Sequence, residues 1–335
     1  MTDGVTTLGR SGVGVTRLGL GGGPVGNLYG VVSDDDAAAT VDAAWEHGVR
    51  YFDTAPHYGL GLSERRLGAA LRDRPRAEYA LSTKVGRRLV PNPGGERERD
   101  LANGFDVPAG LRREWDWSAE GVRRCLAESR DRLGLDRVDI ALLHDPDDSG
   151  DEDAALRFAY PALHELRAAG EVGAIGVGSK QIAILKRFIT ETDLDIIMLA
   201  GRYTLLEQPA LDELLPACTE RGVCVLNVGI FNSGLLATDW PADDGHYEYG
   251  TAPPDKLARA RRIAAVCRAH GTSLPHAALA FAGAHPSVSS VVVGAARAVE
   301  VERNARLWQA PPPPAALWED LVAQDLLRPD APVPS

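Results

Sequence analysis

Four ionisable side chains stand at or shortly after the ends of short apolar segments: Asp53, Tyr58, Lys84 and His144. A tyrosine phenol has an ordinary pKa of about 10, so it is a poor acid or base at neutral pH until its surroundings change that value. We expect Lys84 to stabilise the phenolate of Tyr58, and Asp53 to keep Lys84 charged and oriented. His144 would exchange a hydrogen bond with a substrate oxygen. The set suits proton transfer to or from an oxygen on a carbonyl or carbinol carbon.

Eight apolar segments of strand length must position these side chains. They are rich in Val, Ile and Leu and cover residues 16–20, 49–52, 79–83, 138–143, 172–177, 196–200, 223–228 and 288–293. Near-continuous apolar strands separated by amphipathic helices are typical of a parallel sheet covered by helices. Eight such units in 335 residues predict an α/β fold, a (β/α)₈ TIM barrel. We expect one domain over residues 1–335, with a core at about 8–309 and a tail at 310–335.

Helical patterns fill the intervals between the predicted strands. Ser33 can cap a helix whose first turn holds residues 34–36, all Asp, where the helix dipole favours carboxylates, and Gly48 would end it. A second amphipathic pattern is closed by Gly134, and another covers about residues 254–270. The alternation of strand and helix is therefore continuous along the chain.

Three further segments surround the predicted barrel. Residues 8–15 are expected to form a hairpin across its bottom. The connections 86–117 and 231–253 are too long for plain loops, and because both follow strands they belong on the C-terminal face. For the tail, the sequence leaves two alternatives, folding back over the barrel mouth or disorder.

Residues that end barrel strands gather around one pocket on that face. An Asp at a strand end, taken alone, is more often a helix cap or a turn former than a catalytic group. The joint placement of Asp53, Lys84 and His144 after three successive predicted strands is what indicates an active site.

Charge and cysteine content exclude several classes of protein. The net charge of -11 and the pI near 5.3 argue against nucleic-acid binding and against anionic membranes, because both need concentrated Lys and Arg. The four cysteines form no Cys-x-x-Cys pair, and no His/Asp cluster follows the strands, so we expect no metal and no disulfides. Without a leader or an apolar run of about 20 residues, a cytoplasmic protein with a small-molecule substrate is expected. The sequence carries no indication of oligomeric state.

The neighbourhood of the four residues resembles the signature of the aldo-keto reductase superfamily. The segments that carry it are Phe52-Asp53-Thr54-Ala55-Pro56-His57-Tyr58-Gly59, Gly61-Leu62-Ser63-Glu64, Leu67-Gly68, Ser82-Thr83-Lys84, Leu142-Leu143-His144 and Ile175-Gly176-Val177-Gly178. The similarity extends over about residues 8–304. It implies the (β/α)₈ barrel and a nicotinamide-dependent oxidoreductase. It also implies a catalytic tetrad whose members fall, position by position, on Asp53, Tyr58, Lys84 and His144.

Within the superfamily, residues 144–147, 199–208 and 228–236 resemble the D-threo-aldose 1-dehydrogenase group, which includes L-fucose and L-galactose dehydrogenases. That resemblance implies oxidation of the anomeric C1 of an L-fucose, D-arabinose or L-galactose type of aldose to a lactone. Tyr58 would be the general acid/base. Pyridoxal 4-dehydrogenase is similar over the same segments, so the substrate stays open.

The resemblance also implies a dinucleotide site at the barrel mouth without a Rossmann domain. The expected cofactor-binding residues are Gly21, Gly22, Asp53, Ser179, Tyr203, Phe231, Ser233, Leu235, Gly294, Arg297, Glu300 and Asn304. Ser179 would face the carboxamide and Tyr203 would stack on the nicotinamide ring, while residues 231–235 would supply N–H groups to the pyrophosphate. The two glycines either let the nicotinamide approach or merely form a turn. Two departures from the family pattern, Gly178-Ser179 in place of Ser-Asn and Met198 in place of Gln, alter the carboxamide contacts.

Glu300 stands where NADP-selective relatives often place an Arg. A carboxylate repels a 2′-phosphate and accepts from a ribose 2′-hydroxyl, so we expect NAD to be preferred. The positive charge of Arg297 has the opposite effect and attracts the 2′-phosphate, so we expect the enzyme to accept NADP as well.

Substrate contacts lie outside the conserved pattern of the barrel. Trp115 and Trp117 could stack on a sugar face, although a loop Trp is more often a packing anchor. His57 and Arg202 are the better candidates for contacts with substrate hydroxyls.

Three other functions compete with aldose oxidation. One is an aldehyde or ketone reductase, or an enzyme similar to pyridoxal 4-dehydrogenase. Another is a non-catalytic, dinucleotide-binding regulatory subunit, against which the complete tetrad argues. The last, a metal-dependent barrel hydrolase, lacks a His-x-His motif at the strand ends.

Overall fold

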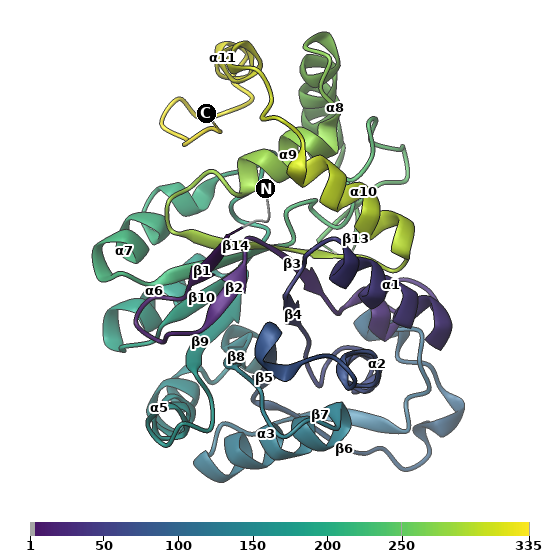
Figure 1. Ribbon diagram of the computed structural model, residues 1–335, viewed down its shortest axis with the longest axis vertical. Helices are drawn as coiled ribbons and strands as arrows, with labels where there is room; N and C mark the ends of the chain where they lie inside the picture. The colour runs from purple at the N-terminus through teal and green to yellow at the C-terminus, as the bar shows by residue number, and fades with distance from the viewer. Residues whose placement is uncertain (1–3, 249, 335) are drawn as a thin grey trace.

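In the computed structural model, which describes residues 4–248 and 250–334, eight parallel strands close into a barrel (Figure 1). The barrel strands are β3 (Leu18–Gly21), β4 (Tyr51–Asp53), β5 (Ala80–Val85), β8 (Ile140–His144), β9 (Ala174–Ser179), β10 (Ile196–Ala200), β11 (Cys224–Val228) and β14 (Val288–Gly294). They pair in that order, and β14 closes the ring on β3. The predicted TIM barrel is confirmed, and the strand bounds differ from the expected ones by at most two residues.

Helices surround the barrel. They are α1 (Asp34–Glu46), α2 (Leu62–Leu71), α3 (Ala119–Leu133), α4 (Glu152–Ala154), α5 (Tyr160–Ala168), α6 (Ile182–Glu191), α7 (Leu214–Arg221), α8 (Pro254–Ala269), α9 (Leu274–Ala282), α10 (Ala298–Gln309) and α11 (Ala315–Ala323). The Ser33 hydroxyl accepts from the N–H of Asp36 at 3.0 Å, as its capping position predicts. Gly134, with a φ of 62°, ends α3 in the left-handed region that glycine adopts without strain.

The main core lies between the strands and these helices, where Phe52, Leu67 and Leu126 are at most 1% exposed. A second cluster fills the inside of the barrel, and two of its members come from the N-terminal hairpin, Leu8 and Val15. That hairpin pairs β1 (Val5–Thr7) with β2 (Gly14–Thr16) and crosses in front of the barrel strands in Figure 1. It covers the bottom of the barrel, as the sequence predicts.

Both long connections carry antiparallel pairs on the C-terminal side of the barrel strands. The first, after β5, contains β6 (Arg87–Pro91) and β7 (Leu111–Trp115). The second, after β11, contains β12 (His246–Tyr247) and β13 (Gly250–Thr251). The two connections are therefore structured elements above the strand ends, where they can shape a site.

The C-terminal tail is ordered, which removes the expectation of disorder. Trp318 of α11 packs against Phe281 of α9, with their ring centroids 6.3 Å apart. Arg259 of α8 donates to the carbonyl oxygens of Asp325 and Leu326 at 3.0 and 2.7 Å. The tail thus packs on α8 and α9.

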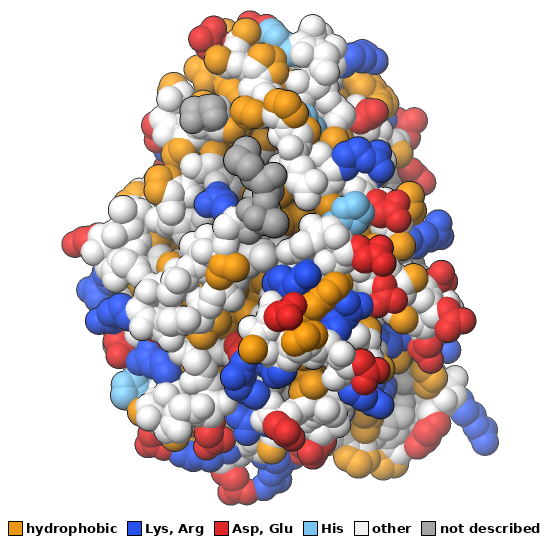
Figure 2. Space-filling model, viewed as in Figure 1, with side chains coloured by type: hydrophobic (Ala, Val, Ile, Leu, Met, Phe, Trp, Pro, Cys, Tyr) orange, Lys and Arg blue, Asp and Glu red, His pale blue; other side chains and the backbone are white. Residues whose placement is uncertain are grey.

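The molecular surface carries charges of both signs. On the face drawn in Figure 2, acidic and basic side chains alternate without a broad basic area, in keeping with the excess of 47 acidic over 36 basic residues. In the described part of the chain, no helix combines the length and the apolar character that crossing a membrane requires.

Candidate active site

Lys84 and Asp53 form a buried ion pair at the C-terminal ends of β5 and β4. Lys84 Nζ donates to Asp53 Oδ1 and Oδ2 at 2.9 and 2.7 Å, and to the carbonyl oxygen of Thr54 at 3.0 Å. The Ser82 hydroxyl donates to the same Oδ1 at 2.6 Å. Lys84 is 2% exposed and Asp53 is 3% exposed. Charges so far from water persist only when they are paired and hydrogen-bonded, so the pair is fixed in place.

Tyr58 lies beside this pair, in the loop between β4 and α2. Lys84 Nζ is 4.6 Å from the centroid of the Tyr58 ring. On its other sides the ring contacts Phe105 and His144, with centroids 6.1 and 5.9 Å away. The next residue, Gly59, has a φ of 61°, and a Cβ there would overlap the carbonyl oxygen of Gly26. Only glycine fits this turn, and the turn aims the phenol into the site.

The surroundings raise the pKa of Tyr58 well above its ordinary value, first through burial and then through the carboxylates of Asp53 and Asp145. The net shift in the free protein is therefore opposite to the lowering expected from Lys84. The Lys84 ammonium directs its hydrogen bonds at the Asp53 carboxylate, which compensates its charge. Tyr58 is a neutral phenol here.

His144 ends β8, and its ring contacts those of Tyr58 and His57, which are also in contact with each other, with the three centroid distances between 5.5 and 6.0 Å. Burial, followed by the positive charges of Arg87 and Lys84, lowers the pKa of His144 well below its ordinary value, so the imidazole is neutral. Nε2 lies 3.4 Å from Oδ2 of Asp145. A neutral imidazole beside a neutral phenol can hold a substrate oxygen by hydrogen bonds without adding charge.

A groove of about 690 Å³ opens at the barrel mouth, and none of the four tetrad side chains is among the described residues that line it. Its walls come from the loops after β3, β9, β10 and β11 and from the start of α10. Volumes of about 300–1,000 Å³ are usual for sites that hold a small molecule or a cofactor. The cationic side chains that line it are Lys180, Arg202, Arg297 and Arg303.

Two buried polar atoms of groove residues, Asn232 Oδ1 and Arg303 Nε, have no hydrogen-bond partner among the described residues. Buried polar groups are normally paired, so these atoms are suited to an anionic, hydroxyl-rich ligand. Asn232, Ser233 and Gly234 all have positive φ, which bends the backbone around the groove. The residues present therefore fit a dinucleotide.

Comparison with known proteins agrees with this arrangement. The aldo/keto reductase family matches residues 17–320. The chain belongs to the aldo-keto reductase family. It is 51% identical to D-threo-aldose 1-dehydrogenase of Pseudomonas sp over 320 residues, which cover 95% of this chain and 96% of the relative. It is 36% identical to pyridoxal 4-dehydrogenase of Microbacterium luteolum, with 96% and 97% covered.

Among solved structures, an aldo-keto reductase from Bacillus halodurans in its holo form has a TM-score of 0.75 to this chain and 26% identity. The match covers 97% of this chain and 96% of that one. This chain is therefore an NAD(P)-dependent oxidoreductase of the aldo-keto reductase family, which removes the alternatives of a non-catalytic subunit and a metal-dependent hydrolase.

In this aldo-keto reductase, many of the expected cofactor residues line the groove. They are Phe231, Ser233, Gly294, Arg297, Glu300 and Asn304. Gly21 ends β3 opposite Gly294, one wall residue of the groove. Gly22 instead packs against α2, because a Cβ there would overlap the side chains of Ser63 and Leu67. The structure thus gives Gly22 a reason that neither of the two expected explanations named, close packing against α2.

Three other expected cofactor residues, Ser179, Tyr203 and Leu235, are not among the residues that line the groove. The Ser179 hydroxyl donates to Asp147 Oδ1 at 2.6 Å, and Leu235 is 2% exposed within the main core. Tyr203 is fully buried, with its ring 4.9 Å from Phe281 and 5.8 Å from His285. The expectation that Tyr203 stacks on the nicotinamide is therefore wrong in this structure, since α9 already covers the ring.

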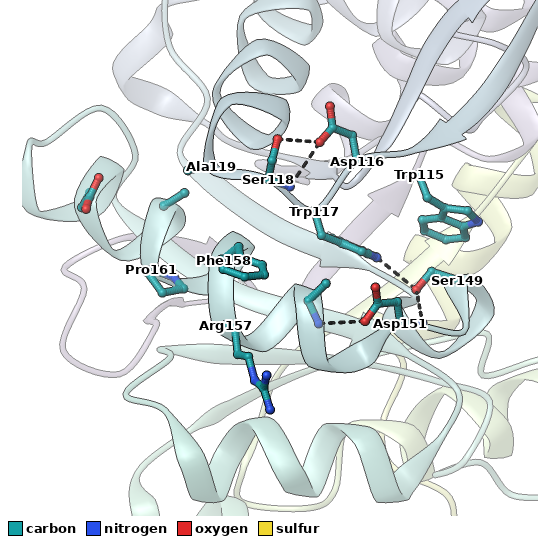
Figure 3. A pocket seen from close by; sticks show the side chains of 13 residues that line it. Trp115, Asp116, Trp117, Ser118, Ala119, Ser149, Asp151, Arg157, Phe158 and Pro161 are labelled. Atoms are coloured by element: carbon teal, nitrogen blue, oxygen red, sulfur yellow. Dashed lines mark hydrogen bonds between the residues drawn. The ribbon is translucent and has the colours of Figure 1, made fainter.

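The four candidate substrate residues lie in three places. His57 lies against the tetrad, 5.5 Å from the His144 ring, and Arg202 lines the groove, where it pairs with Glu248. Trp115 and Trp117 stack on each other at 5.4 Å and line a separate cavity of about 740 Å³ (Figure 3). Trp117 Nε1 donates to Ser149 at 3.0 Å. Trp117 is 5% exposed, so it is a packing anchor.

Three polar residues of the site escaped the sequence analysis. Arg87 of β6 donates to Asp145 and Asp148 at 2.7 and 2.8 Å, and Arg113 of β7 donates to His57. Asp145 has a φ of 43°, and burial raises its pKa to about 6. The two arginines sit in a hairpin with no strand-end signal, but Asp145 follows His144 directly and could have been suspected from that position.

Proposed function

We propose that this aldo-keto reductase oxidises the anomeric C1 of an aldose of the L-fucose, D-arabinose or L-galactose type to a lactone. The observation that carries the proposal is the 51% identity, over nearly the whole of both chains, to D-threo-aldose 1-dehydrogenase. A neutral phenol beside a neutral imidazole suits the reaction, because a sugar hydroxyl is uncharged.

Tyr58 is the proposed general acid/base. In the reducing direction its neutral hydroxyl donates a proton to the carbonyl oxygen, and in the oxidising direction its phenolate takes the proton of the C1 hydroxyl. When bound, the nicotinamide accepts or gives the hydride, and its oxidised form adds a positive charge that favours phenolate. His144 holds the reacting oxygen by a hydrogen bond. The ion pair of Lys84 and Asp53 lies against the Tyr58 ring and holds it in position.

NAD is the proposed preferred cofactor. Glu300 lines the groove, and its Oε2 accepts from the N–H of Ala296 at 2.8 Å. A carboxylate held there would repel the 2′-phosphate of NADP and accept a hydrogen bond from the ribose hydroxyl of NAD. Arg297 is exposed at the start of α10, and its positive charge allows NADP to bind as well, although more weakly than NAD.

A comparison of substrates tests the proposal. We expect NAD reduction with at least one of L-fucose, D-arabinose and L-galactose, at a higher kcat/KM than with pyridoxal or with simple aldehydes and ketones assayed in the opposite direction. Pyridoxal 4-dehydrogenase activity is the second candidate, because the chain is 36% identical to that enzyme. A higher kcat/KM for pyridoxal than for every aldose would favour that candidate and remove the first.

A further inference from the structure

Arg113 of β7 reaches across the loop above the barrel and holds His57 by two hydrogen bonds. Its Nε donates to His57 Nδ1 at 2.5 Å, and its Nη2 donates to the carbonyl oxygen of His57 at 2.7 Å. On the other side, Asp100 accepts from Arg113 Nη1 and Nη2 at 2.8 and 2.6 Å. The Arg113 side chain is 12% exposed and that of Asp100 is 7% exposed. The guanidinium is therefore fixed between a carboxylate and the histidine.

This contact fixes the protonation state of His57. Arginine has only donors, so a ring nitrogen that pairs with it must be an acceptor. Nδ1 of His57 is then unprotonated, and the single ring proton is on Nε2. Burial, together with the charges of Arg113, Arg87 and Lys84, lowers the pKa of His57 to about 2, so the ring stays neutral at every pH where an assay is practical.

The remaining nitrogen of the ring is Nε2. It makes no hydrogen bond with any described residue, and it is not among the buried polar atoms without a partner, so it keeps some exposure to solvent. The ring itself is held edge-on against Phe105, with centroids 5.3 Å apart, and lies 6.0 Å from Tyr58 and 5.5 Å from His144. His57 thus presents one donor, with its orientation fixed, beside the two side chains that hold the reacting oxygen.

We propose that His57 Nε2–H is the donor for a second substrate oxygen, on the carbon next to the reacting carbon, and that Arg113 is the positioning residue that keeps this donor in place. The His57 ring is a direct neighbour of both the Tyr58 and the His144 rings, so a substrate oxygen held by those two side chains would have its neighbouring substituents within reach of a donor on His57. For an aldose this is the C2 hydroxyl, so in that form the inference rests on the proposed function. In general it selects α-hydroxylated carbonyl compounds and their hemiacetals.

A substrate that lacks this oxygen leaves the Nε2–H without a partner in a confined site, which makes the loss larger than that of an exposed hydrogen bond. We expect the wild-type enzyme to prefer an α-hydroxylated substrate over its deoxy counterpart by about 10- to 100-fold in kcat/KM. The preference should depend on the histidine and on its arginine together.

Two substrate pairs test this. The first is D-arabinose against its 2-deoxy counterpart, 2-deoxy-D-ribose, with NAD, and the second is glycolaldehyde against acetaldehyde with NADH. His57→Phe keeps a ring but removes the donor, so the ratio of kcat/KM within each pair should fall toward one. Arg113→Met should lower the ratio in the same sense, and Arg113→Lys, which keeps a donor toward Nδ1, should restore part of it. In the His57→Phe background, Arg113→Met should change the ratio no further.

Arg112→Met is the matched control. Arg112 is the neighbour of Arg113 in the chain, but its side chain is 53% exposed and pairs with Glu114 on the surface. It should leave both ratios unchanged. Equal losses for both members of each pair in the His57 and Arg113 variants would mean a purely structural role and would overturn the inference. If no aldose is oxidised but the glycolaldehyde preference still depends on His57, the proposed function fails and this inference stands.

Discussion

The ammonium of Lys84 donates to both carboxylate oxygens of Asp53, at 2.9 and 2.7 Å, with neither residue more than 3% exposed. Removal of one partner from such a pair leaves a charge in a place where water cannot reach it, which is more costly than loss of an exposed ion pair.

Asp53→Asn should lower the free energy of unfolding by about 3–5 kcal/mol, because Lys84 is left buried without a counter-charge. Chemical denaturation monitored by circular dichroism measures this. The control is Asp34→Asn, which removes the partner of Arg66 at a carboxylate that is 86% exposed and should cost about 1 kcal/mol or less. Similar losses in the two variants would contradict the view of a tightly buried pair.

Tyr58→Phe should reduce kcat by at least about 100-fold, because the ring remains but the proton-carrying hydroxyl is gone. Binding of NADH, followed by fluorescence, should change little, since the hydroxyl is not needed to line the groove. An active Tyr58→Phe enzyme would show that another group carries the proton.

Asp145→Asn should stabilise the protein at neutral pH. The pKa of Asp145 is raised from 3.8 to about 6 by burial, so the unfolded chain ionises first as the pH rises. The folded state is therefore penalised progressively between about pH 4 and pH 6, and the penalty is constant above that window. Asparagine removes the ionisation and tolerates the φ of 43°, so we expect a gain of roughly 1–2 kcal/mol at pH 7 and none at pH 4.

Urea unfolding of both proteins at several pH values measures this difference. Asp148→Asn is the control, because it also removes a partner of Arg87 but at a side chain that is 50% exposed. A gain for Asp145→Asn that does not vary with pH would exclude ionisation of this carboxyl as its cause.

Glu300→Gln should raise kcat/KM for NADP by about 10-fold while it changes that for NAD much less, because the charge that repels the 2′-phosphate is removed but the hydrogen-bonding shape stays. Steady-state kinetics with both cofactors measures the ratio. Glu302→Gln, on the same helix, is the matched control. A wild-type enzyme that already prefers NADP would contradict the proposed role of Glu300.

The barrel could be predicted from the sequence because apolar strands and helix caps are local signals: residues 196–200 were expected as a strand and form β10. Asp53, Lys84 and His144 could be found because strand ends of a parallel barrel meet at one face. Tyr203 was misassigned because the sequence does not show on which side of a loop an aromatic ring is buried. Arg113 was missed because its contact with His57 spans 56 positions and depends on the fold of a hairpin.

The direction of the Tyr58 pKa shift also lay beyond the sequence. It depends first on the burial of the phenol and then on the carboxylates of Asp53 and Asp145, and the sequence shows neither that burial nor those distances. The charge balance of a buried site is a property of geometry, and the order of residues alone does not determine it.

The hairpin of β6 and β7 supplies two arginines that contact sequence neighbours of tetrad residues, Arg87 to Asp145 and Arg113 to His57. Among the described residues, no barrel strand pairs with this hairpin, so it can be replaced without a change in the pairing of the barrel strands. A new hairpin between β5 and α3 could change which molecule is accepted while the strands that carry Asp53, Lys84 and His144 remain untouched. In this enzyme, chemistry and selectivity can therefore diverge on separate pieces of chain.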